Sequence, residues 1–316
     1  MQPAMDFLIK EEQVYSGALG CRGCGWSLLV RHLSSILGKD AVYVVPASCF
    51  SIITGPYPLN DLKANIVHTV FPGASATATG VRAALDRQGK EDTLVVVLAG
   101  DGGTFDIGIQ ALSGAAARGE NILYVCNNNG AYMNTGIQTS TATPYGAVTT
   151  TNPGKGYKRS WPKDLMGIIA AHNLPYAATA SLAFMEDFRE KIKKAKVVHG
   201  FRFIMVDGPC PPGHKTEPGQ SIEIGRLAVE SRLFPLFEVR HQNYKLNYIP
   251  KKLVPVTECM KHQGRFRHLF KEGSEPLLVD VQEHTERYWD RLVELERLSM
   301  NDVFQIEGSM ISEYAL

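Results

Sequence analysis

Short apolar segments that end at turn residues most constrain what this chain of 316 residues can fold into. Each is rich in apolar, mostly β-branched residues and too short for a typical helix, so each is predicted to be a buried strand of a parallel sheet. These predicted strands are residues 41–45, 94–99, 122–126 and 201–206. Helical patterns lie around them, at residues 26–37, 75–85, 107–117, 163–172, 184–195 and 222–233. Strand alternating with helix predicts an α/β fold with a doubly wound, mostly parallel sheet.

Two segments depart from this alternation. Residues 136–162 are rich in Thr, Gly, Pro and Tyr without any period, which predicts a long surface loop with a functional role. After about Tyr244 the sequence becomes irregular and basic, until residues 286–298 place their apolar side chains on one helical face. We therefore expect a main domain of residues 1–243 and a C-terminal extension of residues 244–316 that packs on the body or on a partner subunit.

The charge balance and the cysteine content exclude several classes of protein. With 33 Lys and Arg against 32 Asp and Glu, the formal net charge is +1, so no global field favours nucleic acid or an anionic membrane. No apolar run near the N-terminus approaches the roughly 20 residues that a membrane span requires, and we expect a cytoplasmic protein. Six cysteines are too few for a disulfide framework at this length, so the close pair Cys21 and Cys24 indicates metal or redox chemistry.

Glycines and oxygen-bearing side chains follow two consecutive predicted strands. The sequence GDGGT begins at Gly100, and an Asn-rich sequence that contains Asn129 follows the next strand. Glycines let the backbone approach a diphosphate closely, while Asp101, Asn129 and a carbonyl near Ala131 are hard oxygen ligands for Mg²⁺. The alternative is that both segments are simple turns. An Asp-Gly after one buried strand and an Asn-rich break after the next is nevertheless the pattern of thiamine diphosphate enzymes.

Four of the six cysteines lie beside predicted strand or helix ends. Cys21 and Cys24 precede a helix, Cys49 follows the first strand, and Cys210 follows the last. Because parallel strands deliver their following loops to one edge, the two isolated cysteines should emerge beside the predicted magnesium ligands. Four thiolates suit either Zn²⁺ or an iron–sulfur cluster, and Cys21 with Cys24 alone could form a redox dithiol. One C-x-x-C pair joined by two distant cysteines favours the cluster.

Several other residues invite a functional role but are expected to be structural. Cys126 closes a buried strand and Cys259 lies in the extension, so neither is counted as a ligand. His68 and His214 are single histidines, which are more often structural than catalytic. Asp106 is expected to cap the helix that begins near residue 107.

Five motifs resemble the beta subunit of the pyruvate:ferredoxin oxidoreductases, within the 2-oxoacid:ferredoxin oxidoreductase family. They are residues 21–25 (CRGCG), 100–108 (GDGGTFDIG), 131–138 (AYMNTGIQ), 142–147 (ATPYGA) and 207–213 (DGPCPPG). The resemblance runs from about Tyr15 to Pro235 and implies the fold of the diphosphate-binding domain of thiamine diphosphate enzymes.

The resemblance implies three sets of functional residues. One 4Fe–4S cluster would be bound by Cys21, Cys24, Cys49 and Cys210. Mg²⁺ would be held by Asp101, Asn129 and the Ala131 carbonyl. Thiamine diphosphate would be contacted by Ser48, Cys49, Gly100, Asp101, Gly102, Gly103, Asn129, Ala131, Asn134 and Thr135. Asn134 would also be the catalytic residue that faces the reacting carbon, although an Asn there could equally be a turn residue.

Two departures from the pyruvate pattern bear on the substrate. Ala47 and Ser48 stand where the family has Thr-Gly, and residues 71–73 are Phe-Pro-Gly where it has Phe-Glu-Asn. These differences favour the oxalate oxidoreductase branch, which cleaves oxalate to carbon dioxide without coenzyme A and passes electrons through the cluster to ferredoxin. Pyruvate, with coenzyme A as co-substrate and acetyl-coenzyme A as product, is the alternative.

The chain shows only the diphosphate half of a thiamine site, so partners are expected. By resemblance, alpha- and gamma-type subunits supply the pyrimidine-binding domain and a catalytic Glu, a ferredoxin-like delta subunit carries further clusters, and external ferredoxin accepts the electrons. Two other classes stay open from the residues alone. A non-redox thiamine diphosphate decarboxylase or carboligase would not need the four cysteines, and a zinc-stabilised scaffold subunit would bind no thiamine.

Overall fold

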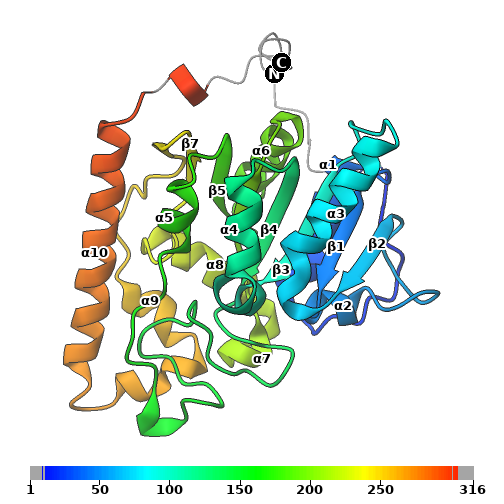
Figure 1. Cartoon of the computed structure of the whole chain (residues 1–316). Coiled ribbons are helices and arrows are strands. Elements are labelled where there is room, and N and C mark those ends of the chain that lie inside the picture. Colours follow the sequence, from blue (N-terminus) through cyan, green and yellow to red (C-terminus); the bar gives the residue numbers. More distant parts are fainter. Residues whose placement is uncertain (1–8, 10, 301, 305–316) are drawn as a thin grey trace, which may run out of the picture.

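The computed structural model describes residue 9, residues 11–300 and residues 302–304 (Figure 1). In this part of the chain, 8 strands form one sheet in the order β2-β1-β3-β4-β6-β5-β7-β8. All neighbours from β2 to β5 are parallel, whereas β7 pairs with β5 and β8 in antiparallel fashion. The strands are β1 (Val42–Pro46), β2 (Asn65–Thr69), β3 (Val95–Gly100), β4 (Ile122–Asn128), β5 (Tyr176–Ser181), β6 (Arg202–Asp207), β7 (Phe237–Arg240) and β8 (Asn243–Leu246). The predicted α/β fold with a mostly parallel sheet is confirmed.

Helices cover both faces of the sheet (Figure 1). Alternate residues of a strand point to opposite faces, so Val95 and Val97 pack toward α3 and α4, while Val96 and Leu98 pack toward α1 and α6. Each face therefore has its own apolar core, and the central strands are buried on both sides. The α-helices are α1 (Gly25–Leu37), α2 (Cys49–Ile53), α3 (Ala74–Arg87), α4 (Ile109–Ala117), α5 (Leu165–Ala170), α6 (Met185–Val197), α7 (Pro211–His214), α8 (Ser221–Glu230), α9 (Val256–Lys261) and α10 (Glu275–Arg297).

The four predicted strands correspond to β1, β3, β4 and β6, with ends that differ by one or two residues. β5 was not predicted because its sequence YAATAS carries alanines, which have little intrinsic preference for strands. It is a strand because it pairs with β6 on one side and β7 on the other. The helix predicted to begin at residue 107 also differs, since a π-helical turn, η2 (Gly102–Ile107), precedes α4.

The C-terminal segment packs on the sheet. Trp289 and Leu292 of α10 join the apolar core on the α3 and α4 side, together with Leu246 of β8. The helix expected at residues 286–298 is therefore the second half of α10. Strand β8 begins at the boundary expected between residues 243 and 244, and the division into two domains stays a prediction.

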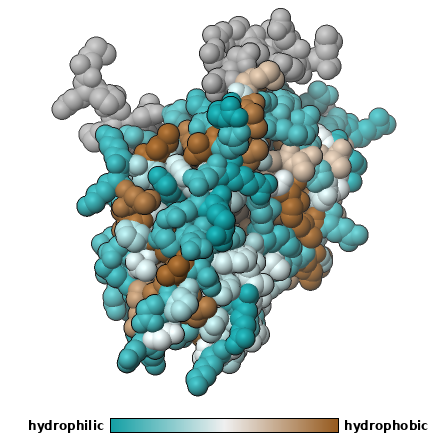
Figure 2. Space-filling view, turned by 90° about the vertical axis from the view of Figure 1, so that its left-hand side faces the viewer, coloured by the Kyte–Doolittle hydropathy of each residue, from teal (hydrophilic) through white to brown (hydrophobic). Residues whose placement is uncertain are grey.

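The outer side of α10 is mostly hydrophilic, with separate apolar patches (Figure 2). Exposed ion pairs such as Arg287 with Glu283 lie on this helix, while Val279 and Val293 are exposed apolar side chains. Among the described residues, no helix combines the length and the apolar composition that a membrane crossing requires.

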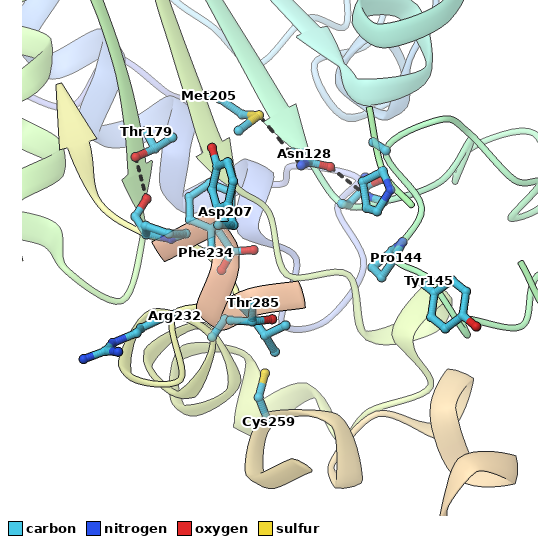
Figure 3. Close-up of a pocket in the computed structure, with 18 of the residues that line it drawn as sticks. Asn128, Pro144, Tyr145, Thr179, Met205, Asp207, Arg232, Phe234, Cys259 and Thr285 are labelled. Atoms are coloured by element: carbon cyan, nitrogen blue, oxygen red, sulfur yellow. Dashed lines mark hydrogen bonds between the residues drawn. The ribbon is translucent and has the colours of Figure 1, made fainter. Parts of the chain in front are cut away.

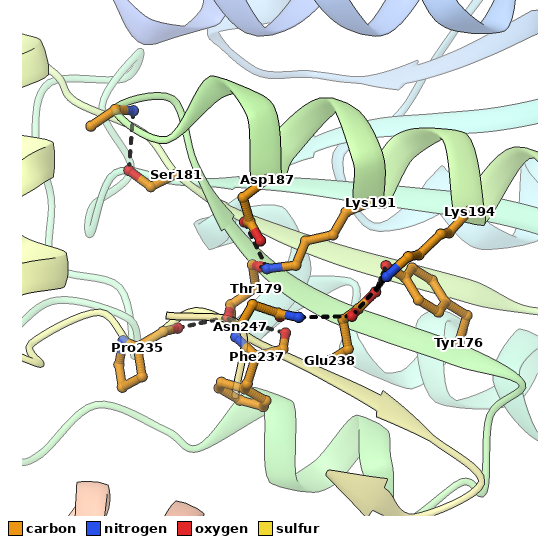
Figure 4. A network of polar contacts seen from close by, with 11 residues as sticks. Tyr176, Thr179, Ser181, Asp187, Lys191, Lys194, Pro235, Phe237, Glu238 and Asn247 are labelled. Carbon is orange, nitrogen blue, oxygen red and sulfur yellow. Dashed lines mark hydrogen bonds and ion pairs between the residues drawn. The ribbon is translucent and has the colours of Figure 1, made fainter. Parts of the chain in front are cut away.

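A buried ionic network joins α6 to the antiparallel edge of the sheet (Figure 4). The Glu238 side chain of β7 is 1% exposed and accepts hydrogen bonds from Tyr176 Oη at 2.6 Å and Lys194 Nζ at 2.8 Å. Asn247 Nδ2 donates to its second carboxylate oxygen at 2.8 Å. Burial opposes the charge of Glu238, but the bonds from Lys194 and Tyr176 outweigh it and hold the pKa below the usual value.

Glu238→Ala should destabilise the fold by about 3 kcal/mol, because it leaves three donors without their acceptor inside the protein. Glu190→Ala is the matched control, since Glu190 forms an exposed ion pair with Lys193 on α6, the helix that also carries Lys194. Loss of this exposed pair should lower the free energy of unfolding by about 0.5 kcal/mol or less. Urea-induced unfolding measures both. Equal losses for the two variants would contradict a structural role for the network.

Candidate thiamine diphosphate site

The parallel register of β3, β4 and β6 aligns the ends of these strands. Gly100 of β3 lies opposite Asn127 of β4, and Asn128 lies opposite Asp207 of β6. The segments that follow the strands therefore leave the sheet at the same edge. Asp101 and Asn129, predicted to meet, are neighbours there, with the Asn129 backbone N–H donating to Asp101 Oδ1 at 3.3 Å.

Three polar groups converge at this edge. The side-chain NH2 group of Asn129, in the amide orientation that satisfies its neighbours, donates to Asp101 Oδ1 at 2.8 Å and to the Ala131 carbonyl oxygen at 3.0 Å. Rotation of this amide by half a turn would bring its oxygen beside the other two oxygens, as a cation among them would require. Carboxylate, amide and carbonyl oxygens are ligands that Mg²⁺ accepts. The residues present therefore fit the predicted ion.

The second oxygen of Asp101 is already engaged. Ser140 Oγ donates a hydrogen bond of 2.5 Å to Asp101 Oδ2, which leaves Oδ1 turned toward Asn129. Asp101 is 1% exposed, and burial raises its pKa to about 7 against the opposing effect of the bonds from Ser140 and the Asn129 N–H. A cation beside Oδ1 would favour the charged carboxylate in this buried place.

Ser140 is itself positioned by a buried lysine. Lys158 Nζ donates to the carbonyl oxygens of Ser140, Thr141 and Thr143 at 3.2, 3.2 and 2.6 Å. Burial lowers the pKa of Lys158 to about 8. The segment 136–162, predicted to be a long functional loop, is thus irregular but internally bonded, with a single described helical turn, η3 (Gly154–Gly156). Neither Ser140 nor Lys158 stands out in the sequence, because a single Ser or Lys in a polar loop is usually solvated.

The predicted role of Asp106 is wrong. The helix α4 begins after Gly108 and has no side-chain cap. Asp106 Oδ2 instead accepts hydrogen bonds from Tyr132 Oη at 2.9 Å and from the Thr141 backbone N–H at 3.1 Å. The Tyr132 ring lies so close to Gly102 that a Cβ there would stand 2.4 Å from the ring, which requires glycine. Asp106 therefore ties the loops after β3 and β4 to the segment 136–162.

The remaining residues of the predicted coenzyme site lie near this edge, partly on the surface. Ser48 and Cys49 begin α2 directly after β1, and Gly103 follows Gly102 in η2. Asn134 and Thr135 are exposed in the turn after β4, where Thr135 Oγ1 donates to Gln138 Oε1 at 2.7 Å. The catalytic role of Asn134 stays a prediction.

Four thiols from three segments are neighbours. Cys21, Cys24, Cys49 and Cys210 are all free, and Cys21 is exposed. Burial raises the pKa of Cys49 to about 12, with further contributions from Cys210, Cys24 and Cys21, in that order. The Gly25 backbone N–H donates to the Pro209 carbonyl at 3.2 Å and joins the first segment to the last. Within the described ranges, however, no group of three or more His, Cys, Asp or Glu is arranged to hold a metal ion, and the cluster stays a prediction.

His214 holds the backbone of Asn129 in place. Its Nε2–H donates to the Asn129 carbonyl at 2.8 Å, and burial lowers its pKa well below the usual value, so the ring is neutral. This is a positioning contact that a single histidine in the sequence did not indicate. His68, by contrast, is exposed on the edge strand β2, while Cys126 and Cys259 are buried.

Comparisons with known proteins decide the family. Residues 49–206 match the thiamine pyrophosphate enzyme, C-terminal TPP binding domain. The chain is 45% identical to ketoisovalerate oxidoreductase subunit VorB of Pyrococcus furiosus over 295 residues, 90% of this chain and 94% of that protein. It is 47% identical to pyruvate synthase subunit PorB of Methanothermobacter thermautotrophicus over 266 residues, 83% and 92% of the two chains. The chain is a beta subunit of the 2-oxoacid:ferredoxin oxidoreductase family.

A solved structure agrees with this fold. The 2-oxoglutarate:ferredoxin oxidoreductase from Magnetococcus marinus, at 24% identity, superposes with a TM-score of 0.56 over 70% of this chain and 81% of its own. The predicted family, the oxidoreductase class and the thiamine diphosphate-binding domain are confirmed by the family match and the relatives, which also imply partner subunits. Oxalate as substrate is not supported, and the relatives named pyruvate synthase support the pyruvate alternative better.

Ser140→Ala should weaken the Mg²⁺-dependent retention of thiamine diphosphate by about tenfold, because Asp101 loses the bond that orients its carboxylate. Thr150→Ala is the control, since its hydroxyl donates to the Gly136 carbonyl in the same loop but does not contact Asp101. Coenzyme retained after gel filtration at a series of Mg²⁺ concentrations measures the effect. Equal retention by both variants would contradict the positioning role of Ser140.

Proposed function

We propose that this beta subunit serves an enzyme that oxidises pyruvate, with coenzyme A, to acetyl-coenzyme A and carbon dioxide and passes the electrons to ferredoxin. The observation that carries the proposal is the similarity to subunits named pyruvate synthase, at 47% identity in Methanothermobacter thermautotrophicus and 39% in Thermotoga maritima, where the match covers 94% of this chain. Only the differences from the pyruvate pattern at Ala47, Ser48 and residues 71–73 favoured oxalate as the substrate. Ketoisovalerate is the second candidate, because subunits with that name are equally similar.

Thiamine diphosphate and Mg²⁺ belong at the edge where β3 and β4 end. Asp101, Asn129 and the Ala131 carbonyl would hold the ion, and Ser48, Gly100, Gly102, Gly103 and Thr135 would lie against the coenzyme. When bound, the coenzyme supplies the nucleophilic carbon that allows a 2-oxoacid to lose carbon dioxide. The chain's own contribution is placement, since Ser140 and His214 orient the residues around the ion. Asn134, exposed in the turn after β4, would face the reacting carbon.

A 4Fe–4S cluster is the proposed electron acceptor beside the coenzyme. Cys21, Cys24, Cys49 and Cys210 would bind it, and their position as electrostatic neighbours supports this set. A cluster placed there would lie at the same sheet edge as Asp101, whose charge also acts on Cys49.

Partner subunits would complete the site. The family match covers residues 49–206 and corresponds to one domain of a thiamine site, so we propose that alpha- and gamma-type subunits supply the pyrimidine-binding domain and its Glu. A ferredoxin-like delta subunit and external ferredoxin would carry the electrons onward, in the cytoplasm. The C-terminal extension from residue 244 would face the body or one of these partners.

Substrate assays on the complete complex test the proposal. Viologen reduction should show the highest kcat/KM with pyruvate, and the reaction should require coenzyme A. Ketoisovalerate with coenzyme A and oxalate without it are run in parallel. Coenzyme A-independent turnover of oxalate would overturn the proposal in favour of the oxalate branch, and a higher kcat/KM for ketoisovalerate would favour the second candidate.

A further inference from the structure

A cavity of about 290 Å³ lies between the sheet edge and the C-terminal extension (Figure 3). Its walls come from the ends of β5 and β6, from helices α5, α8 and α9, from η5 (Gly264–Phe270) and from α10. One end reaches the back of the turn that carries Asn129 and Gly130. The proposed reaction does not use this space.

A guanidinium group with unused donors lines the inner end. Arg265 of η5 is 8% exposed, and its Nε–H donates to Gln263 Oε1 at 2.9 Å. Across residues 11–300, neither terminal nitrogen of Arg265 has a hydrogen-bond acceptor or an ion-pair partner. A charged donor set removed from bulk water is costly unless an acceptor meets it. The structure thus has a place for an anion beside Arg265.

A carboxyl group within the electrostatic reach of Arg265 lines the same cavity. Asp207, at the end of β6, lines the cavity and accepts no hydrogen bond from any described residue (Figure 3). Burial raises its pKa to about 7, against the opposing charge of Arg265. In its protonated form it can donate a hydrogen bond to a ligand oxygen. A protonated Asp207 and Arg265 could therefore both donate to a ligand in this cavity.

The rest of the lining limits the ligand's size and character. The rest of the wall is mostly apolar, with Met166, Phe234 and Met260 among its residues, although Arg232 also lines it. A volume of 290 Å³ lies at the lower end of the range for small-molecule pockets, which favours a ligand much smaller than coenzyme A. At the outer end the rings of Tyr145, Trp161 and His284 stack, with centroids 4.3 and 3.8 Å apart, and Trp161 is 36% exposed. A small molecule could enter where these rings meet solvent.

We infer that this cavity binds a small organic carboxylate with a short apolar chain, its carboxylate on Arg265 and its chain against the apolar wall. Planar carboxylates match the paired N–H groups of a guanidinium better than other small anions of this size. The inference goes beyond the proposed function, because it concerns a second ligand in a cavity that reaches the proposed magnesium site only at the turn of Asn129 and Gly130.

Isobutyrate is the probe, because it has the proposed shape but lacks the 2-oxo group needed for turnover. Isothermal titration of the complete complex, saturated with thiamine diphosphate and Mg²⁺, should show one site for each beta subunit. Isobutyramide, the neutral molecule of the same shape, should bind weaker by about tenfold or more, because it has no charge for Arg265.

Three variants test whether isobutyrate binds in this cavity. Arg265→Met removes the cation, and Ala228→Phe fills the space while Arg265 stays, so each should weaken isobutyrate binding by about tenfold or more. Arg267→Met is the matched control, since Arg267 is an exposed residue of the same η5, and it should bind like the original protein.

Three outcomes would overturn the inference: no saturable binding, equal binding of isobutyramide, or unchanged affinity in Ala228→Phe. The last result would place isobutyrate elsewhere, for instance in the catalytic site. Because the probe is not a substrate, a failure of pyruvate oxidation would leave this test unaffected, and the two proposals can fail separately.

Discussion

The parallel register of β3, β4 and β6 is the constraint on which the rest of the structure depends. It places the residues after Gly100, Asn128 and Asp207 at one edge, although they are far apart along the chain. Asp101 and Asn129 meet there for that reason, and Cys210 follows three residues after Asp207. A shift of one strand by a single residue would exchange the faces of its side chains, so the two apolar cores also protect the site's geometry.

Beyond the strand ends, buried polar groups rather than regular elements give the site its shape. Lys158 donates hydrogen bonds to three carbonyl oxygens of the loop 136–162, one of them the carbonyl of Ser140. The Ser140 hydroxyl in turn donates to Asp101 and orients its carboxylate. The extension contributes in the same way, since it brings Arg265 close behind Gly130. Each of these charges is costly to bury, so each is retained only where acceptors or a ligand meet it.

Much of this architecture could be predicted from local patterns, and the exceptions have physical reasons. The buried strands and the GDGG and Asn-rich turns carry strong signals, because short apolar runs that end at turn residues are typical of buried parallel strands. β5 is alanine-rich and becomes a strand only through its neighbours. Asp106 was misassigned because a carboxylate before a helix resembles a cap, whereas its partners Tyr132 and Thr141 come from later segments. The substitutions at Ala47 and Ser48 bear on specificity only together with partner residues, so they could not identify the substrate.

The central claim is that sulfur ligands and a magnesium-anchored coenzyme share the edge that this register creates. Anomalous diffraction at the iron absorption edge, from anaerobically grown crystals of the complete complex, tests it most directly. The account predicts one iron centre in the beta subunit, bonded to Cys21, Cys24, Cys49 and Cys210. An anomalous signal that belongs to zinc, or an iron centre bound by other residues, would contradict it.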